Sequence, residues 1–443
     1  MNLLHTYPNI KTKPATNRLA LRTISVALTI ALLMSMFTVV MAGVASAAWP
    51  EFQGNPNRTG QITNGVPPTT TPTVTIANLG LSLYGINVEP VLETVNGITY
   101  AYVLYPSGAL SGASIAKIDV SNPTPALIWT TSLSARGVSQ LSTPYLDNDY
   151  IYVGISLSAT TSELASVNKI TGVSTTLVSG IAGQINTPIT KYGNYLYFGT
   201  YNGNNEYFQY NLSTNTYTKF IGYSDFYWAG AYSNGTHVFF GGDGGYLYCL
   251  PVASFGGSAS SSNTVTLPAG AGDVRSSISR DGNYLYFTSK GGYLWRILVS
   301  NIASVSSVRV PNATTPLIST STPAISQAEH IYVGYYSSLG GGGNGGVVTV
   351  PINNFTQAAV KTIYSGDAVQ ASPIVYTVGS TDYIYFTTNV ATGKGYCYTY
   401  TAGATTGGLA WSAGGSNYAL QGFASDNGYL VYGDNSGKLY IMK

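Results

Sequence analysis

Nine polar or aromatic residues occupy comparable places in the chain, shortly before a Pro or its equivalent that opens a β-rich run. Side chains of these types can hydrogen-bond a polar small molecule or a sugar, with Trp228 as a stacking platform and Arg275 against an anionic group. They predict a mostly neutral ligand-binding mouth; a water-filled channel is the alternative. The set comprises Glu89, Gln140, Asn186, Asp225, Trp228, Asp273, Arg275, Gln370 and Gln421.

Other chemistry has little support in the sequence. Glycan hydrolysis needs two carboxylates about 5 to 10 Å apart, and the six Glu are spread over five regions. No Gly-x-Ser-x-Gly motif with a plausible His partner is present, and the three His form no cluster with Cys249 or Cys397. The two cysteines lie in equivalent strands of non-adjacent repeats, so we expect no disulfide. We predict no catalytic residue and no metal ligand.

A repeated unit must position the polar residues. It consists of a Pro-led β run, a short turn and an aromatic β run, as in 322–325 followed by 330–334. Eight copies occur, with the Pro or its equivalent at positions 90, 144, 188, 231, 277, 323, 373 and 423. A period near 45 residues in an all-β chain is typical of propellers, because one four-stranded sheet cannot bury both of its faces alone. We predict an all-β, eight-bladed β-propeller with four-stranded antiparallel blades over residues 73–443.

The last repeat ends at 438–442, one strand short of four. Residues 73–76 alternate as a strand does but have no partner nearby in the sequence. We therefore predict that this N-terminal strand closes the ring by completing blade eight.

The N-terminus is typical of an export signal. Four basic residues precede an apolar run over 24–42, and Ala45-Ser46-Ala47 offers a cleavage site. We predict a cleaved signal peptide over 1–47 and a secreted or cell-surface protein; an uncleaved anchor is the alternative. The mature chain keeps 15 Lys and Arg against 17 Asp and Glu, so we expect no nucleic-acid partner and no membrane span after cleavage.

The mature chain begins with a distinctive segment at 49–60, within a connector of 48–72. Its order, Trp-x-x-Phe-x-Gly-Asn-x-x-Arg-Thr-Gly, resembles the opening of pyrroloquinoline-quinone-like propeller repeat proteins. That family includes quinoprotein alcohol dehydrogenases and the outer-membrane barrel-assembly propeller lipoprotein. We expect Trp49 and Phe52 to be apolar plugs, Gly54 and Gly60 turn positions, and Arg58 a hydrogen-bonding clamp.

The blade motif supports the same resemblance. The run 245–250 is similar to the family's Gly-x-Leu-Tyr-Ala-Leu repeat, and Trp129 and Trp411 stand where its fourth-strand Trp stacks between blades. The family's dehydrogenases use pyrroloquinoline quinone with calcium and a vicinal Cys pair, which this chain lacks. The resemblance therefore implies the fold but no inherited cofactor.

These observations predict a non-catalytic binding or interaction scaffold whose partner is a protein or glycan at the cell envelope. Two alternatives stay open at this point. One is a quinoprotein oxidoreductase with a diverged site for pyrroloquinoline quinone and calcium; the other is a carbohydrate-binding or carbohydrate-active propeller.

Overall fold

The structure is a computed structural model that describes residues 49–77, 85–106, 112–134, 142–311, 317–338, 343–415 and 417–443. The predicted signal peptide and Gln140 lie outside these residues. Among the described residues, no helix has the length and apolar character that crossing a bilayer requires.

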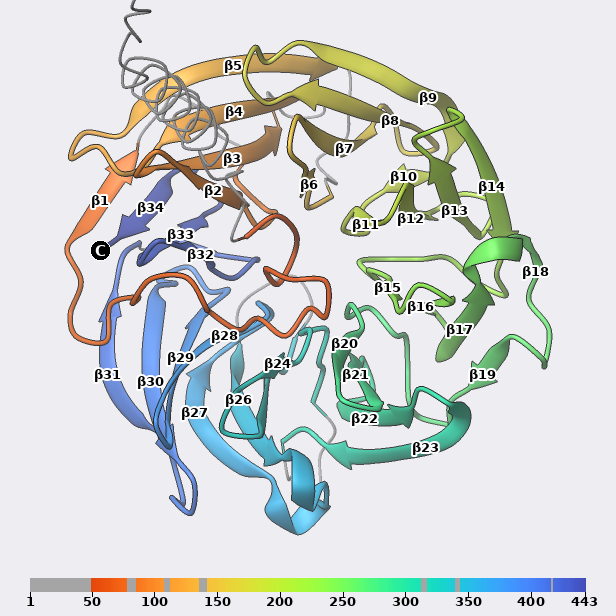
Figure 1. The fold of residues 1–443 in the computed structure, drawn as a ribbon. Coiled ribbons are helices and arrows are strands. Elements are labelled where there is room, and N and C mark those ends of the chain that lie inside the picture. Colours follow the sequence, from red (N-terminus) through yellow and green to blue (C-terminus); the bar gives the residue numbers. More distant parts are fainter. Residues whose placement is uncertain are drawn as a thin grey trace, which may run out of the picture. The chain divides into compact units, whose positions relative to one another are not determined.

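The described strands form eight antiparallel sheets arranged as blades around a common axis (Figure 1), which confirms the predicted propeller. The strands of blades 1 and 2 are β2 (Val91–Val95), β3 (Ile98–Pro106), β4 (Ala113–Asp119), β5 (Ala126–Ser134), β6 (Tyr145–Leu146), β7 (Tyr150–Ser156), β8 (Thr161–Asn168) and β9 (Ser174–Ala182). Those of blades 3 and 4 are β10 (Gln184–Ile185), β11 (Thr190–Tyr192), β12 (Tyr195–Tyr201), β13 (Glu206–Asn211), β14 (Thr216–Ile221), β15 (Tyr232–Ser233), β16 (His237–Gly242), β17 (Tyr246–Pro251) and β19 (Thr264–Thr266).

Blades 5 to 8 continue the same pattern. Blades 5 and 6 contain β20 (Ser279–Asp281), β21 (Tyr284–Ser289), β22 (Tyr293–Leu298), β23 (Asn301–Arg309), β24 (Ala324–Ile325), β25 (His330–Tyr336), β26 (Asn344–Pro351) and β27 (Lys361–Asp367). Blades 7 and 8 contain β28 (Ile374–Val378), β29 (Thr381–Thr387), β30 (Gly395–Thr401), β31 (Gly408–Ala413), β32 (Ala424–Asp426), β33 (Tyr429–Gly433), β34 (Leu439–Met442) and β1 (Val74–Ala77).

Two connectors carry short additions. In blades 4 and 6, the connector between the third and fourth strands contains a 3₁₀ turn, η1 (Val252–Ser254) or η2 (Ile352–Asn354), and η3 (Gln357–Ala359) follows η2. After η1, β18 (Gly257–Ser258) pairs in parallel with β14 of blade 3. The blade 4 connector therefore covers the outer edge of its neighbour.

The middle strands of the blades are buried on both faces, which explains their aromatic and aliphatic runs. In β16, Phe239 packs into the core shared with blade 5, and the next residue, Phe240, packs toward blade 3. The ring of Phe240 stacks on Tyr207 of β13, with the two centroids 3.8 Å apart. Since successive side chains of a strand point to opposite faces, each blade contributes to two interblade cores.

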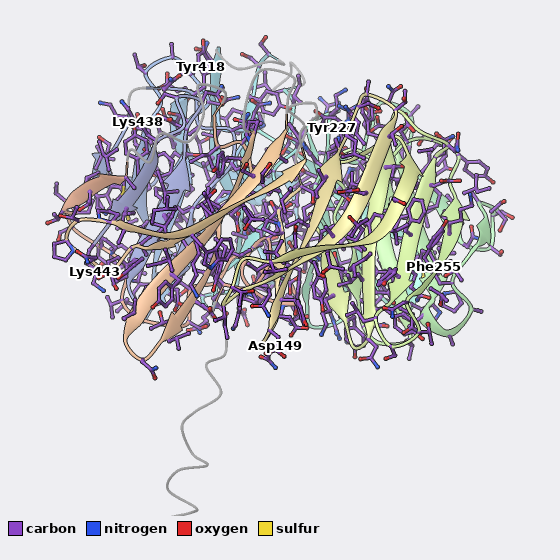
Figure 2. All side chains as sticks on the ribbon, turned by 90° about the horizontal axis from the view of Figure 1, so that it is seen from above. Asp149, Tyr227, Phe255, Tyr418, Lys438 and Lys443 are labelled. Atoms are coloured by element: carbon purple, nitrogen blue, oxygen red, sulfur yellow. The ribbon has the colours of Figure 1, made fainter. Side chains whose placement is uncertain are left out.

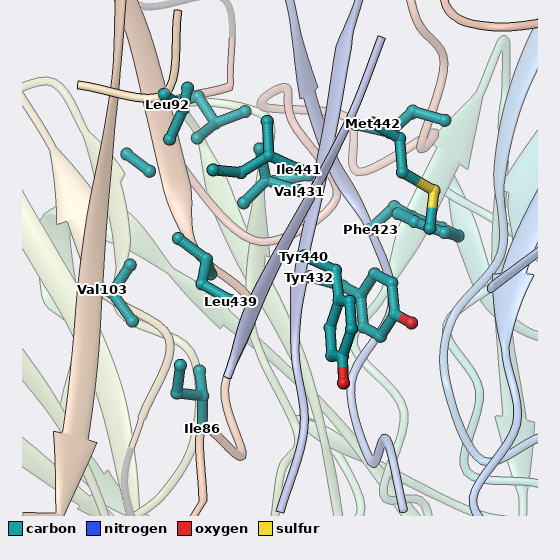
Figure 3. Close-up of a cluster of buried hydrophobic side chains, with 14 of the residues drawn as sticks. Ile86, Leu92, Val103, Phe423, Val431, Tyr432, Leu439, Tyr440, Ile441 and Met442 are labelled. Carbon is teal, nitrogen blue, oxygen red and sulfur yellow. The ribbon is translucent and has the colours of Figure 1, made fainter. Parts of the chain in front are cut away.

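The ring closes through blade 8, as predicted. β1 pairs antiparallel with β34, and Val74 lies opposite Met442. Figure 3 shows the core at this closure, where Leu439 and Ile441 of β34 lie toward Leu92 and Val103 of blade 1. The two ends of the propeller are thus held by backbone pairing and by a shared apolar core.

The two expected inter-blade tryptophans lie in fourth strands, Trp129 in β5 and Trp411 in β31. A Cβ on Gly172 of blade 2 would come within 3.1 Å of the Trp129 ring, so this indole packs on the next blade. Trp411 lies edge-on to Phe423, next to β32 of blade 8, with centroids 6.5 Å apart. The residues that resemble the family motif therefore have the expected structural role.

Candidate functional site

The N-terminal segment 49–64, here called the plug, lies inside the ring of blades (Figure 1). Its backbone or side chains contact the innermost strand of each blade, or the residue before that strand. The contacted residues are Leu92, Leu146, Thr190, Ala231, Arg280, Ile325, Val375 and Asp426. One short segment therefore ties all eight blades together and fills one end of the channel with protein.

The motif residues of the plug have the predicted roles. Trp49 and Phe52 are buried, and Gly54 and Gly60 adopt left-handed φ angles of 77° and 59°. A Cβ on Gly54 would lie 2.5 Å from the Trp49 ring, so this turn requires glycine for space as well as for conformation. The guanidinium of Arg58 is fully buried, donating to Thr190 Oγ1 at 2.8 Å and to the Ala231 carbonyl.

Two carboxylates are buried with the plug. Burial raises the pKa of Glu51 to about 7 against the opposing effect of Arg58. Burial likewise raises the pKa of Glu89 to about 8, although the carboxylate accepts hydrogen bonds from Trp49 Nε1 at 2.7 Å and from the Gln53 N–H at 3.0 Å. Glu89 thus anchors the plug, and it does not line the cavity above.

A cavity of about 30 Å³ lies on the axis above Phe52. Five of the predicted site residues line it, which are Asn186, Trp228, Arg275, Gln370 and Gln421. Asn186 is buried, and neither atom of its amide has a hydrogen-bond partner within the described residues. Polar and apolar residues both line the cavity, and none of the described lining residues is Asp or Glu. In this conformation the cavity is wide enough only for water or a similarly small group.

The rim above the cavity carries a charged network at blades 4 and 5. Arg275 donates to both oxygens of Asp243, from Nε at 2.9 Å and from Nη2 at 2.6 Å, and Nη2 also lies 3.3 Å from Asp273. Lys290 binds the same Asp273 oxygen at 2.8 Å. Burial opposes ionisation of Asp273, but hydrogen bonds from the Gly244 N–H and Lys290 hold its pKa below the ordinary value.

Trp228 lines the cavity at its open end, here called the mouth, and has a backbone φ of 58°. Left-handed backbone is a genuine outlier for a bulky aromatic residue and costs on the order of 1–3 kcal/mol. Gly230 follows two residues later, and its N–H donates to the Trp228 carbonyl at 2.9 Å. The surrounding fold therefore holds this indole at the cavity against an unfavourable local conformation.

Two tyrosines that the sequence interpretation missed complete the mouth. The Tyr227 ring lies 4.7 Å from Trp228 and 4.6 Å from Tyr201 between centroids, and the Arg275 guanidinium lies 4.4 Å over it. Figure 2 shows Tyr227 at the same end of the ring as Tyr418, away from Asp149 and Phe255. Proximity to Trp228 in the sequence was the available signal, but Tyr is too frequent in this chain for that signal to be distinctive.

Asp225 lies beside this group and not in the cavity wall. Its Oδ2 accepts the Asn202 N–H at 3.1 Å, whereas its buried Oδ1 has no partner within the described residues. Asp225 and Asp273 thus belong to the rim, Glu89 holds the plug from blade 1, and the remaining described members of the predicted set line the cavity.

Pyrroloquinoline quinone with calcium does not fit these residues. The 30 Å³ space above Phe52 is far smaller than the 300–1,000 Å³ of typical cofactor and ligand pockets. Calcium takes six to eight oxygen ligands, yet the described part of the chain has no group of three His, Cys, Asp or Glu placed to share an ion. Cys249 and Cys397 are free thiols in separate blades.

Comparisons with known proteins define the fold. Neither protein-family profiles nor curated protein sequences give a match. The structure is similar to BamB from Moraxella catarrhalis, with a TM-score of 0.55 and 14% identity over 84% of this chain and 99% of that one. It is also similar to the computationally designed Ika8 protein, with a TM-score of 0.55 and 12% identity over 82% and 96% of the two chains. These likenesses show the propeller fold alone.

The two similar structures also illustrate that this fold does not determine an activity. A natural protein and a designed one reach the same TM-score, so the blades alone do not specify a ligand. Function must therefore be argued from the mouth and its residues.

Proposed function

We propose that this protein is a secreted or cell-surface binding scaffold without catalytic activity, and that it holds a protein partner at the mouth formed by Tyr201, Tyr227, Trp228 and Arg275. The observation that carries the proposal is the strained Trp228 backbone, because strain of this kind persists where a side chain must be presented. The export signal predicted for 1–47 supports the location, and the resemblance to envelope propellers supports the partner class.

The composition of the mouth supports a protein partner. Aromatic rings and Arg are the residues that most often dominate binding energy at protein interfaces. Tyr227 and Trp228 are half-buried, so part of each side chain is accessible to a partner. Asp243 and Asp273 hold the guanidinium of Arg275 in place, which leaves little side-chain entropy to lose on binding.

The test is cross-linking to envelope proteins followed by measurement of the affinity for the protein identified. We expect Trp228→Ala to weaken binding at least tenfold. Tyr217→Ala is the matched control, because Tyr217 is an aromatic residue on the outer strand β14 of blade 3 and is 49% exposed. Equal affinity of both variants and the parent protein would refute the assignment of the mouth.

A glycan is the second candidate partner, favoured by the Tyr201, Tyr227 and Trp228 rings beside the side chains of Asp225 and Asn202. Sugars are bound by stacking on aromatic faces together with hydrogen bonds to nearby carboxylates and amides. Glycan-array binding that is lost in Trp228→Ala and kept in Tyr217→Ala would assign the mouth to sugars, and an empty array would leave the protein partner.

The oxidoreductase alternative has a direct assay. Reconstitution with pyrroloquinoline quinone and calcium, followed by dye-linked dehydrogenase measurements over a range of alcohols, should give no signal above the protein-free control. A saturable signal would replace the scaffold proposal by a catalytic one.

A further inference from the structure

A second cavity lies between blades 4 and 5, away from the mouth. Its volume is about 430 Å³, which is within the range of small-molecule pockets. Its walls include His237 and Cys249 of blade 4 together with Arg280, Val299 and Ile302 of blade 5. None of the residues that line it is Asp or Glu.

The neighbouring grooves are filled by a phenylalanine from a connector. Between blades 3 and 4, Phe255 follows η1 and lies 5.8 Å from the Tyr197 ring. Between blades 5 and 6, Phe355 follows η2 and lies 6.2 Å from the Tyr286 ring, with the Arg296 guanidinium 4.6 Å over it. Both rings are buried, so each closes its groove.

The second cavity is the corresponding groove between blades 4 and 5, here called the open groove. Strand register identifies the residues of the open groove that are equivalent to those of the two filled grooves. Tyr197 pairs with Gln209, Phe239 with Cys249, and Tyr286 with Arg296. Cys249 therefore occupies the place that a long polar side chain takes on either side. Its thiol is too short to cross the groove as those side chains do.

The connectors that follow the third strand of blades 4, 5 and 6 can be aligned by their backbone hydrogen bonds. The N–H groups of Val252, Val299 and Ile352 each donate to a carbonyl in the preceding hairpin of their own blade. Gln209 Nε2 then donates to the Val252 carbonyl at 3.0 Å, and Arg296 Nη1 donates to the Ile352 carbonyl at 3.2 Å. In blade 5 only two residues separate β22 from β23, so no 3₁₀ turn and no phenylalanine follow Val299.

The open groove has a positive group fixed at its wall. Arg280 donates from Nε to the Gly282 carbonyl at 3.0 Å and from Nη1 to Tyr232 Oη at 2.5 Å. Neutral acceptors thus hold its guanidinium, and no carboxylate of the described chain forms an ion pair with it. An oriented guanidinium without an ionic partner is suited to binding a carboxylate.

We propose that this groove binds a small aromatic carboxylate. The ring takes the place that Phe255 and Phe355 fill in the adjacent grooves, against the apolar side chains of Val299 and Ile302. The carboxylate faces Arg280, and His237 lines the same space. The site is independent of the mouth, so it holds or fails separately from the scaffold function.

The experiment is isothermal titration of the mature protein with 3-phenylpropionate, with the neutral 3-phenylpropanamide as the matched ligand. We expect saturable one-to-one binding of the acid and at least tenfold weaker binding of the amide. Arg280→Gln should weaken binding of the acid at least tenfold, whereas Arg309→Gln, which changes an exposed arginine of the same blade, should not. Thermal unfolding of each variant checks that the blades are intact.

A second measurement uses the thiol of Cys249, which lines the open groove. Cys397 is fully buried, so alkylation of the folded protein should modify Cys249 alone, and bound 3-phenylpropionate should slow that reaction in proportion to occupancy. Cys249→Gln, which restores the residue type of position 209, should occupy part of the groove and weaken binding of the acid. Absence of saturable binding, equal binding of acid and amide, or unchanged binding in Arg280→Gln would each overturn the proposal.

Discussion

Arg58 and Glu51 form an ion pair inside the plug, with Nη2 and Oε2 3.1 Å apart and both side chains almost completely buried. The guanidinium also reaches blades 3 and 4 through Thr190 and the Ala231 carbonyl. The pair therefore joins a segment from the start of the mature chain to the middle of the ring, and its loss should be felt across the whole fold.

Replacing Arg58 tests this coupling. We expect Arg58→Met to lower the free energy of unfolding by about 3–5 kcal/mol, because the buried Glu51 carboxyl, Thr190 Oγ1 and the Ala231 carbonyl would all lose the donor that Arg58 provides. The control is Lys219→Met, since the Lys219–Glu206 pair is half exposed and should contribute at most about 1 kcal/mol. Urea unfolding followed by tryptophan fluorescence measures both, and similar losses would contradict the special role of Arg58.

The buried carboxylates predict a pH dependence of stability. Folding raises the pKa of Glu51 to about 7 and of Glu89 to about 8 from 4.5. A raised pKa means that the folded state binds the proton more tightly, so the contribution is complete below about pH 4.5 and is lost as the pH rises through 7 to 8. The unfolding free energy should fall by a few kcal/mol between pH 5.5 and 9, at about 1.4 kcal/mol per pKa unit.

Glu89→Gln is the variant that isolates this effect. The amide oxygen can still accept the hydrogen bonds from Trp49 Nε1 and the Gln53 N–H, while the titration is removed. Unfolding free energies of this variant should vary less with pH than those of the parent protein. An unchanged slope would show that Glu89 ionises normally in the folded protein.

The backbone of Trp228 predicts a difference between two truncations. Trp228→Ala and Trp228→Gly both remove the indole, but only Gly adopts a φ of 58° without steric cost. We expect the Gly variant to be more stable than the Ala variant by about 1 kcal/mol, although both lose binding. At Tyr217, within β14, the order should reverse, because Gly destabilises a strand.

Ring closure predicts a position-dependent effect of proline in β1. Thr73 and Lys443 exchange both backbone hydrogen bonds, so Thr75, opposite Ile441, occupies the next hydrogen-bonded position and Ile76 does not. Thr75→Pro should lower the melting temperature and promote association through the exposed edge of β34. Ile76→Pro should be milder, and light scattering with calorimetry distinguishes the two.

Local chemistry accounts for what the sequence predicted well. The Pro-led repeat and its aromatic run recur because each blade has to solve the same packing problem, so blade number and the ring-closing strand could be predicted before any contact was known. The segment 49–60 was informative for the same reason, since Gly54, Gly60 and Arg58 each satisfy a local backbone or hydrogen-bonding need.

Only the tertiary structure decided which side chains meet. Glu89, Asp225 and Gln421 hold similar places in the repeat, yet Glu89 binds the plug, Asp225 lies in the rim and Gln421 lines the cavity. The reason is that the plug enters the channel and that connectors differ in length from blade to blade. The open groove beside Arg280 depends on a phenylalanine that is absent from one connector and present in two others. Repeat periodicity determines where a strand begins, whereas contacts across the ring and between blades determine what a polar side chain can bind.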